Sequence, residues 1–358
     1  MHQSLLQTWK AIWQKPPRRS RHPGLRRLHS PARIRKILRR ERMRTDRNGD
    51  PFCLVTFLAR EGESAKETFV SLVKILRRRL RYTDDLGWLD ADHVAAVLPS
   101  TPLSGAMKVV DDVCRVFPTD RWPPLCTVYC YPSDSLAGGS PLVEDSSVPV
   151  HAMEPLFAEG IAFSKRCLDV TVSAVGLMLL MPLMLLIAAA IRLTSRGPAL
   201  YCQPRTGWAG RTFVLFKFRT MVVGAEQQKA RLRALNELDG PAFKIRRDPR
   251  VTLLGRVLRK FCLDELPQLW NVLIGDMSLV GPRPLPCDES AQCAGWQRGR
   301  LDITPGLTCF WQVRGDLETS FADWVRMDLR YARSRSLRHD FALLLKTIPV
   351  VVLGKGRY

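Results

Sequence analysis

The sequence predicts an N-terminal α/β module followed by a membrane-associated domain, and three observations lead to this fold class. Residues 51–131 alternate between strand-like and helical apolar patterns. Residues 132–149 are rich in Ser, Gly and Pro, which is typical of linkers, and we place the linker at 132–160. Residues 170–191 carry no charge over 22 positions, and a helix of that length can cross a bilayer core.

The composition of the 358-residue chain narrows the class of protein. Lys and Arg number 55 against 34 Asp and Glu, so the net charge is +21, and 46% of residues are hydrophobic. This balance excludes a disordered tail and a polytopic membrane protein, and it indicates an anionic partner such as nucleic acid, anionic lipid or a phosphorylated substrate. The ten cysteines form no CxxC pair, which suits a reducing compartment. No signal peptide is visible, so we expect the protein to face the cytosol.

Residues 1–50 form a basic lead in which Arg and Lys are dense and apolar residues are few. One interpretation is a solvated or partly helical tail. Another is attraction to an anionic membrane leaflet, at about 1 kcal/mol for each basic residue near the surface. Nucleic acid is the third, and it is disfavoured because no aromatic-interleaved binding motif accompanies the charge.

Residues 51–131 have the pattern of a small α/β domain. The predicted order is a strand at 51–59, a helix at 67–80, a hairpin at 86–99, a helix at 105–117 and a strand at 125–132. The order resembles a degenerate diguanylate cyclase (GGDEF-type) domain. In place of that family's glycine-rich signature the chain has Asp90-Ala91-Asp92-His93-Val94. Without those glycines we expect no cyclase activity, a regulatory or dimerising role, and an ordinary hairpin at Asp92 and His93.

The uncharged segment has two features that argue against a straight membrane span. Pro182 lies at its middle, where it removes a backbone hydrogen bond and kinks a helix. Basic residues flank both ends, so neither end is expected to leave the cytosol. We therefore predict a re-entrant helix over residues 166–192 that breaks at Pro182. A single-span anchor and a buried soluble helix remain as alternatives.

A glycine-punctuated basic segment follows the apolar helix. Gln203 and Arg205 precede the turn at Gly207 and Gly210, and residues 211–221 then have a strand-like pattern. Lys217 and Arg219 should alternate out of its apolar face. This pattern is compatible with an anion site and equally with a solvated strand.

Two adjacent carboxylates, Asp264 and Glu265, are the strongest candidates for chemistry. Because Pro267 is tolerated only in the first turn of a helix, the helix that follows should begin near Asp264, with Asp264 at its N-cap. The amides at that end favour a bound phosphate. One carboxylate can attack or bind metal while the other handles a proton. Simple helix capping is the alternative interpretation.

Basic residues flank the carboxylate pair on both sides. Arg256, Arg259 and Lys260 precede it, and they can neutralise phosphate oxygens. Arg283 follows it in the stiff, proline-bounded turn 281–284, which suits bidentate contact with a phosphate.

The region from Lys165 to the C-terminus resembles the monotopic phosphoglycosyl transferases, bacterial sugar transferases that act on polyprenyl phosphate. About 195 residues match in the right order. The matching motifs are Lys165-Arg166-x-x-Asp169, Gly197-Pro198, Gln203-x-Arg205-x-Gly207, Lys217-Phe218-Arg219-Thr220-Met221, Asp248-x-Arg250, Leu258-Arg259-Lys260, Asp264-Glu265-Leu266-Pro267-Gln268, Gly281-Pro282-Arg283-Pro284, Pro305-Gly306-Leu307-Thr308, Trp311-Gln312-Val313 and Asp328-x-x-Tyr331.

The resemblance implies a mostly helical monotopic catalytic domain at 161–358, with a re-entrant helix, on the cytosolic face of the bacterial inner membrane. It implies that Asp264 attacks the sugar-bearing phosphate of a UDP-sugar and releases UMP. Polyprenyl (undecaprenyl) phosphate then accepts the sugar phosphate, with Glu265 assisting, which initiates exopolysaccharide or glycoconjugate assembly. Mg²⁺ near Asp264 would neutralise the diphosphate. The phosphate-binding residues implied are Arg259, Arg283, Lys217, Arg219, Arg205 and Gln268.

The chain also departs from the family pattern. Cys309 replaces a usual glycine and Asp316 a usual basic residue, which affects the sugar pocket, and Met181 precedes Pro182 where Ser is common. The segment from about 322 fits an interfacial amphipathic helix or a core helix equally well. A non-enzymatic, membrane-docked regulator that senses a nucleotide is the competing class. The sequence identifies neither the sugar nor the oligomeric state, and it leaves a homodimer open.

Overall fold

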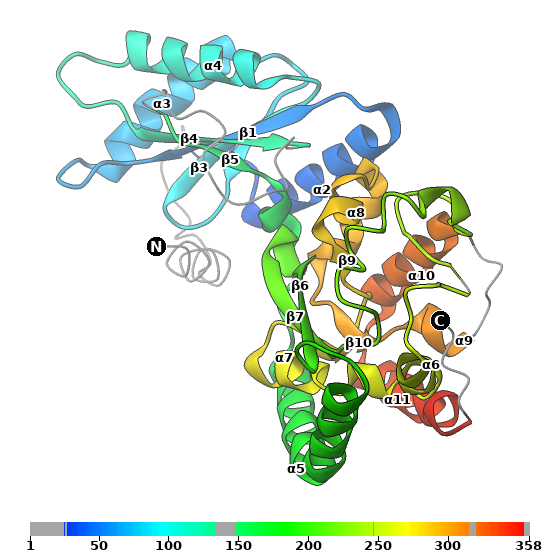
Figure 1. Cartoon of the computed structure of the whole chain (residues 1–358). Helices are drawn as coiled ribbons and strands as arrows, with labels where there is room; N and C mark the ends of the chain where they lie inside the picture. Colours follow the sequence, from blue (N-terminus) through cyan, green and yellow to red (C-terminus); the bar gives the residue numbers. More distant parts are fainter. Residues whose placement is uncertain (1–24, 26, 133–147, 246, 315–319, 354–358) are drawn as a thin grey trace. The chain divides into compact units, whose positions relative to one another are not determined.

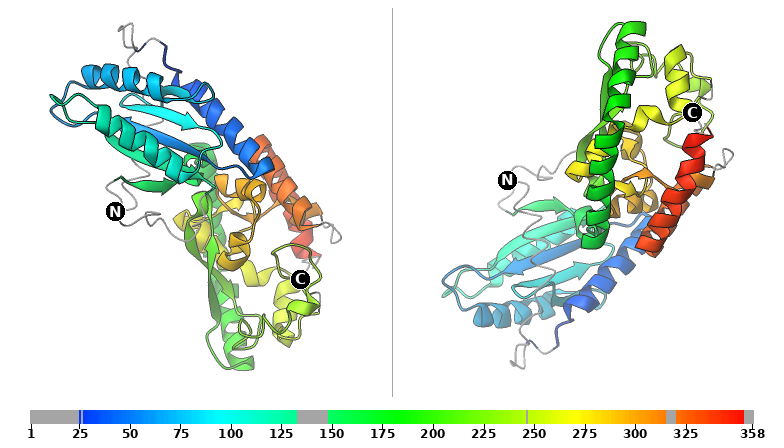
Figure 2. Two further views of the ribbon diagram at one scale, coloured as in Figure 1. Left: turned by 90° about the horizontal axis from the view of Figure 1, so that it is seen from above. Right: turned by 90° about the horizontal axis from the view of Figure 1, so that it is seen from below.

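The computed structural model describes residues 25, 27–132, 148–245, 247–314 and 320–353 (Figure 1). The chain divides into two compact units, residues 1–156 and 157–358. Two further views of the same ribbon are given in Figure 2.

The first unit is built on a five-stranded sheet with the order β2-β3-β1-β4-β5. β1, β2, β3 and β4 pair in antiparallel fashion, and β5 joins β4 in parallel. The strands are β1 (Phe52–Leu58), β2 (Asp85–Trp88), β3 (His93–Leu98), β4 (Leu125–Tyr131) and β5 (Val150–Ala152), and the helices are α2 (Pro31–Asn48), α3 (Ala65–Arg79) and α4 (Leu103–Val116). Each strand and helix predicted between residues 51 and 131 is present.

Both faces of this sheet are covered. Side chains alternate along a strand, so Cys53, Val55 and Phe57 share one face of β1, where they belong to one core with residues of α3 and α4 (Figure 1). Phe52 and Leu54 point to the opposite face and are also fully buried. The sheet therefore needs cover on its second face.

Helix α2 forms part of the first unit, and this corrects the expectation of a basic tail up to residue 50. Its residues Ile34, Ile37 and Leu38 are at most 2% exposed, and Ile34 lies directly against Gly87 of β2. Ser30 caps the helix by accepting a hydrogen bond from the Arg33 amide. The apolar spacing of one helical face was present in the sequence but was obscured by the many Arg and Lys residues between. Residues 1–24 lie outside the described part of the chain.

The structure can also be compared with the predicted hairpin and the predicted linker. Asp90 is buried at the β2–β3 turn, where its Oδ1 accepts hydrogen bonds from the amides of Asp92 and His93 at 2.7 and 2.8 Å. Asp92 and His93 are therefore ordinary hairpin residues, as expected. β5 lies inside the segment predicted to be a linker, since three residues are too few for a recognisable strand pattern.

The second unit is largely helical and contains two small sheets. β6, β7 and β9 form one sheet in the order β7-β6-β9, and β8 and β10 pair in parallel. The helices are α5 (Phe163–Thr194), α6 (Leu253–Lys260), α7 (Gln268–Ile274), α8 (Cys287–Ala291), α9 (Phe310–Arg314), α10 (Phe321–Ser334) and α11 (Leu337–Val352), and the strands are β6 (Leu200–Thr206), β7 (Thr212–Phe218), β8 (Ser278–Val280), β9 (Leu285–Pro286) and β10 (Gly306–Thr308).

Helix α5 is the one helix in the described part of the chain that is long and apolar enough to cross a membrane. It runs without interruption from Phe163 to Thr194 with Pro182 inside it. The predicted break at Pro182 is therefore not an end of the helix, because proline removes only one hydrogen bond from a ladder that continues on both sides.

Polar contacts hold the first turns of α5 on the rest of the unit. Lys165 Nζ donates to Asp340 of α11 at 2.6 Å and to the carbonyl of Val280 at 3.1 Å. Arg166 donates to the carbonyls of Val272 and Leu273 at the end of α7. This end of α5 is thus fixed in a polar protein environment.

One face of α5 then packs along the whole helix. Leu177 and Leu180 join the core that contains Leu269 of α7, and Ile187 and Ile191 join the core that contains Phe218 of β7. The opposite face exposes large apolar side chains, which are Val172, Val175, Met178, Leu179, Met181, Leu183, Leu185 and Leu186. The helix is therefore covered by protein on one side and leaves the other side apolar and open.

Helix α10 resolves the alternative left open for the C-terminal segment. Trp324, Val325 and Tyr331 are at most 8% exposed, so α10 is a core helix. The exposed apolar stripe lies instead on α11, where Phe341, Leu345, Ile348 and Val352 are each more than half exposed.

Gly281, which follows β8, and Gly306, the first residue of β10, bring two stretches of backbone into direct contact. A Cβ added at Gly306 would lie 2.0 Å from the Gly281 amide nitrogen, and the Gly306 amide donates to the Pro282 carbonyl at 2.9 Å. No side chain fits there without displacing the turn that carries Arg283.

We predict that Gly306→Ala destabilises the second unit by about 1–3 kcal/mol, the usual cost of overpacking a well-packed site. Gly160→Ala is the control, because a Cβ at Gly160 meets nothing within 4 Å. Denaturant unfolding in detergent measures both variants. Equal stability of the two would contradict the close backbone approach.

Candidate active site

Asp264 and Glu265 lie in a short 3₁₀ turn, Leu263–Glu265, and this differs from the predicted helix start. Cys262 precedes the turn in the left-handed region, at φ 53°, and helix α7 begins only at Gln268 with Pro267 at its N-cap. Asp264 is therefore not the N-cap of α7. The amide of Glu265 donates to the Cys262 carbonyl, so the turn satisfies its own backbone and leaves the carboxylates for other contacts.

The Asp264 carboxylate is buried without saturating its oxygens. The side chain is 4% exposed, and its Oδ1 has no hydrogen-bond partner among the described residues. Burial and, to a smaller extent, the Glu265 charge raise the pKa of Asp264 to about 6, although the nearby cations Lys217, Arg259 and Arg283 oppose the rise. A buried, unpartnered oxygen close to several cations is unfavourable alone and suits a reacting or ligating atom.

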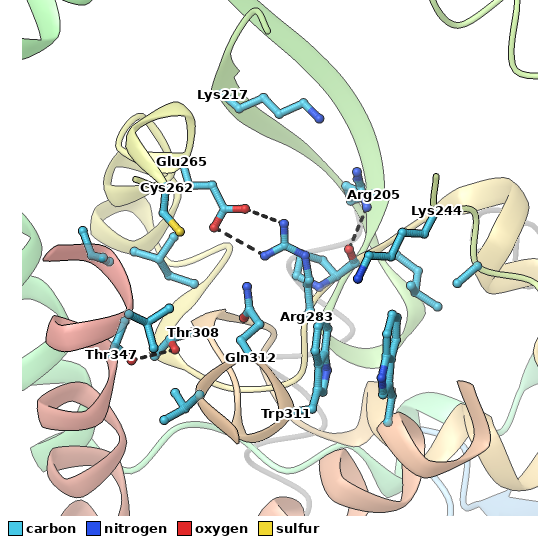
Figure 3. Close-up of a pocket in the computed structure, with 18 of the residues that line it drawn as sticks. Arg205, Lys217, Lys244, Cys262, Glu265, Arg283, Thr308, Trp311, Gln312 and Thr347 are labelled. Atoms are coloured by element: carbon cyan, nitrogen blue, oxygen red, sulfur yellow. Dashed lines mark hydrogen bonds and ion pairs between the residues drawn. The ribbon is translucent and has the colours of Figure 1, made fainter. Parts of the chain in front are cut away.

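Glu265 has a different environment, because it forms an ion pair with Arg283 through both of its carboxylate oxygens (Figure 3). The backbone of Arg283 is held in turn: Arg300 donates to the Arg283 carbonyl at 2.6 Å and pairs with buried Asp328 at 2.7 Å. Burial raises the pKa of Asp328 to about 6, and the Arg300 charge opposes this rise. The adjacent carboxylates thus differ, one being paired and the other open.

Strand β7 and its partner β6 bring three more of the predicted residues to the site, which are Lys217, Arg205 and Arg219. Lys217 is half-buried with its Nζ 5.0 Å from the centre of the Tyr201 ring. Arg205 donates to the Pro284 carbonyl at 2.9 Å and to Gln203 at 2.7 Å. It therefore stabilises the turn that carries Arg283 as well as lining the site.

Arg219 is more engaged with the protein than the sequence suggested. It is 8% exposed, and its Nη2 donates to the carbonyl and the hydroxyl of Ser195 at the end of α5. It still lines the cavity that contains Asp264, which is described below as the polar cavity. The prediction that Arg219 points out of the strand into an anion site is thus only partly met. Its Nη2 is used to bond the end of α5 to β7.

Helices α6 and α7 supply Arg259 and Gln268. Arg259 donates from Nε to Thr220 at 2.9 Å, and Gln268 is 3% exposed in the first turn of α7. Both line the polar cavity, whereas Arg256 and Lys260 are exposed and do not. One face of an eight-residue helix can present only some of its basic residues to the site, and Arg259 is on that face.

These side chains surround a polar cavity of about 430 Å³, and all eight predicted catalytic and phosphate-binding residues line it. Its walls also contain residues that the sequence analysis did not single out as site residues. They come from β6 and the segment between β7 and α6, and they are Tyr201, Glu226, Lys229, Lys244 and Arg250. Only Arg250 carried a signal, as part of the Asp248-x-Arg250 motif. Lys229 and Lys244 lie in a segment without a recognisable pattern.

A second cavity of about 400 Å³ adjoins the first and is shown in Figure 3. The stacked indoles of Trp311 and Trp324, 4.2 Å apart and 2° from parallel, form part of its wall. Cys309 is not a lining residue, but its Sγ donates to Oε1 of Gln312, which lines the cavity, at 2.9 Å. The departure at Cys309 thus lies next to this cavity, while Asp316 is outside the described residues.

The residues present would fit a Mg²⁺ ion that takes one ligand from the protein. No group of three or more His, Cys, Asp or Glu side chains suited to a metal occurs in the described part of the chain. Mg²⁺ commonly keeps several waters and binds one or two carboxylates together with substrate phosphates. Asp264, with its unpartnered Oδ1, provides such a carboxylate, whereas Glu265 is already paired with Arg283.

The chain belongs to the bacterial sugar transferase family, whose sequence model matches residues 161–354. This confirms the family predicted from the sequence and places the protein among transferase enzymes. The chain is 42% identical over 194 residues to the galactosyl transferase CpsE of Streptococcus agalactiae serotype III, a match that covers 54% of this chain and 43% of CpsE. It is 40% identical over 199 residues to the exopolysaccharide production protein ExoY of Rhizobium meliloti, covering 54% of this chain and 88% of ExoY.

A third relative extends the similarity beyond the matched domain. The undecaprenyl-phosphate glucose phosphotransferase of Komagataeibacter xylinus is 35% identical over 283 residues, which cover 75% of this chain and half of the relative. That length requires alignment upstream of residue 161. The diguanylate cyclase SiaD of Pseudomonas aeruginosa is 18% identical with a TM-score of 0.25 over 36% of this chain and 55% of SiaD, which is too low to establish the fold of the first unit.

We predict that Lys217 loses its proton near pH 8, against about 10.4 for a free lysine. Burial, together with the charges of Arg205 and Arg259, lowers the pKa of Lys217 to about 8 against the opposing effect of Asp264. Removing the Asp264 charge by Asp264→Asn should therefore lower the Lys217 pKa still more. Competitive acetylation followed by mass spectrometry measures the midpoint. A midpoint near 10 in both proteins would show that the Lys217 amine is solvated.

Proposed function

We propose that the protein transfers a sugar-1-phosphate from a UDP-sugar to polyprenyl (undecaprenyl) phosphate, releasing UMP, and so initiates exopolysaccharide or glycoconjugate assembly. The observation that carries this proposal is the buried Asp264 carboxylate, whose Oδ1 has no partner among the described residues and which lies near Lys217, Arg259 and Arg283. A nucleophile that attacks a diphosphate needs an open oxygen in a field of positive charge.

The reaction consists of two displacements at one phosphorus. An Asp264 oxygen bonds to the sugar-bearing phosphorus while the bridging P–O bond breaks, and UMP leaves with that oxygen and its electron pair. An oxygen of the acceptor phosphate then bonds to the same phosphorus, and the Asp264 carboxylate leaves. The product is a polyprenyl diphosphate sugar, and Asp264 is regenerated. No oxidant or reductant is needed.

The surrounding residues compensate the charges that develop in each step and take up a proton. Lys217, Arg259 and Arg283 oppose the charge that builds on the phosphate oxygens. Glu265, held by Arg283, takes up a proton where the acceptor phosphate arrives protonated. Mg²⁺ bound at Asp264 and the diphosphate would supply further charge neutralisation.

The names of relatives support this reaction class. The matched proteins include an undecaprenyl-phosphate galactose phosphotransferase of Salmonella typhimurium and a UDP-glucose:undecaprenyl-phosphate glucose-1-phosphate transferase of Caulobacter vibrioides. The competing interpretation, a non-enzymatic regulator, does not explain why the carboxylate pair and its cations remain together around one cavity.

We expect purified protein incubated with a suitable UDP-sugar to release one UMP per active site without acceptor and to gain the mass of a phosphosugar on Asp264. Asp264→Asn should lose both, by at least about 10³-fold in rate, because the amide cannot form the acyl phosphate. Asp323→Asn, at an exposed ion pair with Arg326, is the matched control. UMP release that persists in Asp264→Asn would rule out the covalent route.

We further propose that α5 is a re-entrant, monotopic anchor at the cytosolic face of the inner membrane. A helix that crosses a bilayer as a single span would be surrounded by lipid, whereas α5 is packed against the unit along one face and apolar on the other. Its start at Lys165 and its end beside Ser195 both contact the protein. Lys165 and Arg166 precede the apolar segment and Arg192 and Arg196 follow it, and these basic flanks favour keeping both ends on the cytosolic side.

Two native cysteines test this topology. Cys167 lies at the start of α5 and Cys202 follows its end, and both are exposed. In single-cysteine variants, a membrane-impermeant maleimide should label both in inverted vesicles and neither in intact spheroplasts. Labelling from opposite sides would establish a spanning helix. Cys293, which is buried, is the single-cysteine control for reagent access to the folded interior.

A further inference from the structure

The two adjoining cavities share one wall and otherwise differ in chemistry. Glu265 and Arg283 line both of them, together with Arg205, Lys217 and Lys244, whereas Asp264 lines only the polar cavity. Figure 3 shows the Glu265–Arg283 pair among the residues that line the second cavity. The two cavities therefore meet at Glu265, next to Asp264 in the sequence.

The residues that line only one cavity differ in kind. The polar cavity alone contacts Arg219, Lys229, Arg250 and Arg259, a set of cations that suits a nucleoside diphosphate. The second cavity, which we call the apolar cavity, is lined mainly by hydrocarbon. Its own residues include Phe261, Leu263, Leu266, Leu269, Leu307, Val313, Leu344, Val350 and Val351. The cations of this cavity lie at the wall that it shares with the polar cavity, apart from Arg300, so the rest of the cavity suits a hydrocarbon chain better than a UDP group.

Helix α11 connects the apolar cavity with an exposed apolar surface. Leu344 and Val351 line the cavity, while Leu345, Ile348 and Val352, which form a neighbouring stripe of the helix, are more than half exposed. The exposed stripe has the character of a face that contacts lipid. The exposed apolar stripe and the cavity-lining side chains therefore belong to one helix, which brings an apolar surface next to the cavity.

We propose that the apolar cavity binds the phosphate-proximal isoprenoid units of the acceptor lipid, so that donor and acceptor use different cavities. The assignment rests on the proposed function. An in-line displacement requires the acceptor phosphate to attack from the side opposite the Asp264 oxygen, the side that UMP has left. The wall that both cavities share, with Glu265 and Arg283, is where that phosphate meets the aspartyl phosphosugar.

Two neighbouring residues of α11 provide a matched test, since Val351 lines the cavity and Val352 is 68% exposed on the neighbouring stripe. Val351→Trp should raise the KM for polyprenyl phosphate by about tenfold, which corresponds to about 1.4 kcal/mol, because the indole fills the space for the isoprenoid chain. It should leave the UMP burst with donor alone unchanged, and that burst also shows that the variant is folded. Val352→Trp should alter neither quantity.

A short acceptor separates cavity binding from membrane partition. With farnesyl phosphate, which has only three isoprenoid units, Val351→Trp should raise KM as it does with the long acceptor. An effect confined to the long acceptor would assign Val351 to membrane contact and overturn the proposal. An unchanged KM for both acceptors, or a lost burst in Val351→Trp alone, would also overturn it. A wild-type protein without any burst would instead refute the proposed function.

Discussion

The structure of the second unit depends on how it keeps one carboxylate buried and incompletely bonded. Burial alone would neutralise Asp264, and it does raise the pKa of this group to about 6. Lys217, Arg259 and Arg283 counteract the rise, and Lys217 is itself affected, because burial lowers its pKa to about 8. The two shifts have the same first cause, the removal of both charged groups from water by burial.

Keeping those charges in place requires a rigid support that none of the charged side chains supplies alone. Arg283 lies on a turn whose backbone is held by Arg300 at one carbonyl and by Arg205 at the next. Buried Asp328 pairs with Arg300. The direct backbone contact between Gly281 and Gly306 also holds the same turn in place. Losing one support would therefore move the guanidinium that orients Glu265, although neither Asp328 nor Gly306 needs to touch substrate.

The sequence was informative where chemistry or periodicity is local. The strands and helices of 51–131 follow from their apolar spacing, and Asp264, Glu265 and Arg283 lie in a short run with recognisable proline and glycine positions. Lys244 could not be predicted, because its place in the cavity depends on a segment without periodic pattern. The helix start near Asp264 was wrong, since the left-handed residue Cys262 allows a 3₁₀ turn before α7. The packing of α2 was hidden by its many charges.

The same reasoning explains why the anchor and the active site belong to one unit. α5 packs on α7, whose first turn carries Gln268, and on β7, which carries Lys217. Arg219 bonds to Ser195 where α5 ends. A helix fixed in this way sets the position of its open apolar face relative to the carboxylates. Under the proposed function, this arrangement would bring an acceptor phosphate at the membrane surface to a site built directly on the helix.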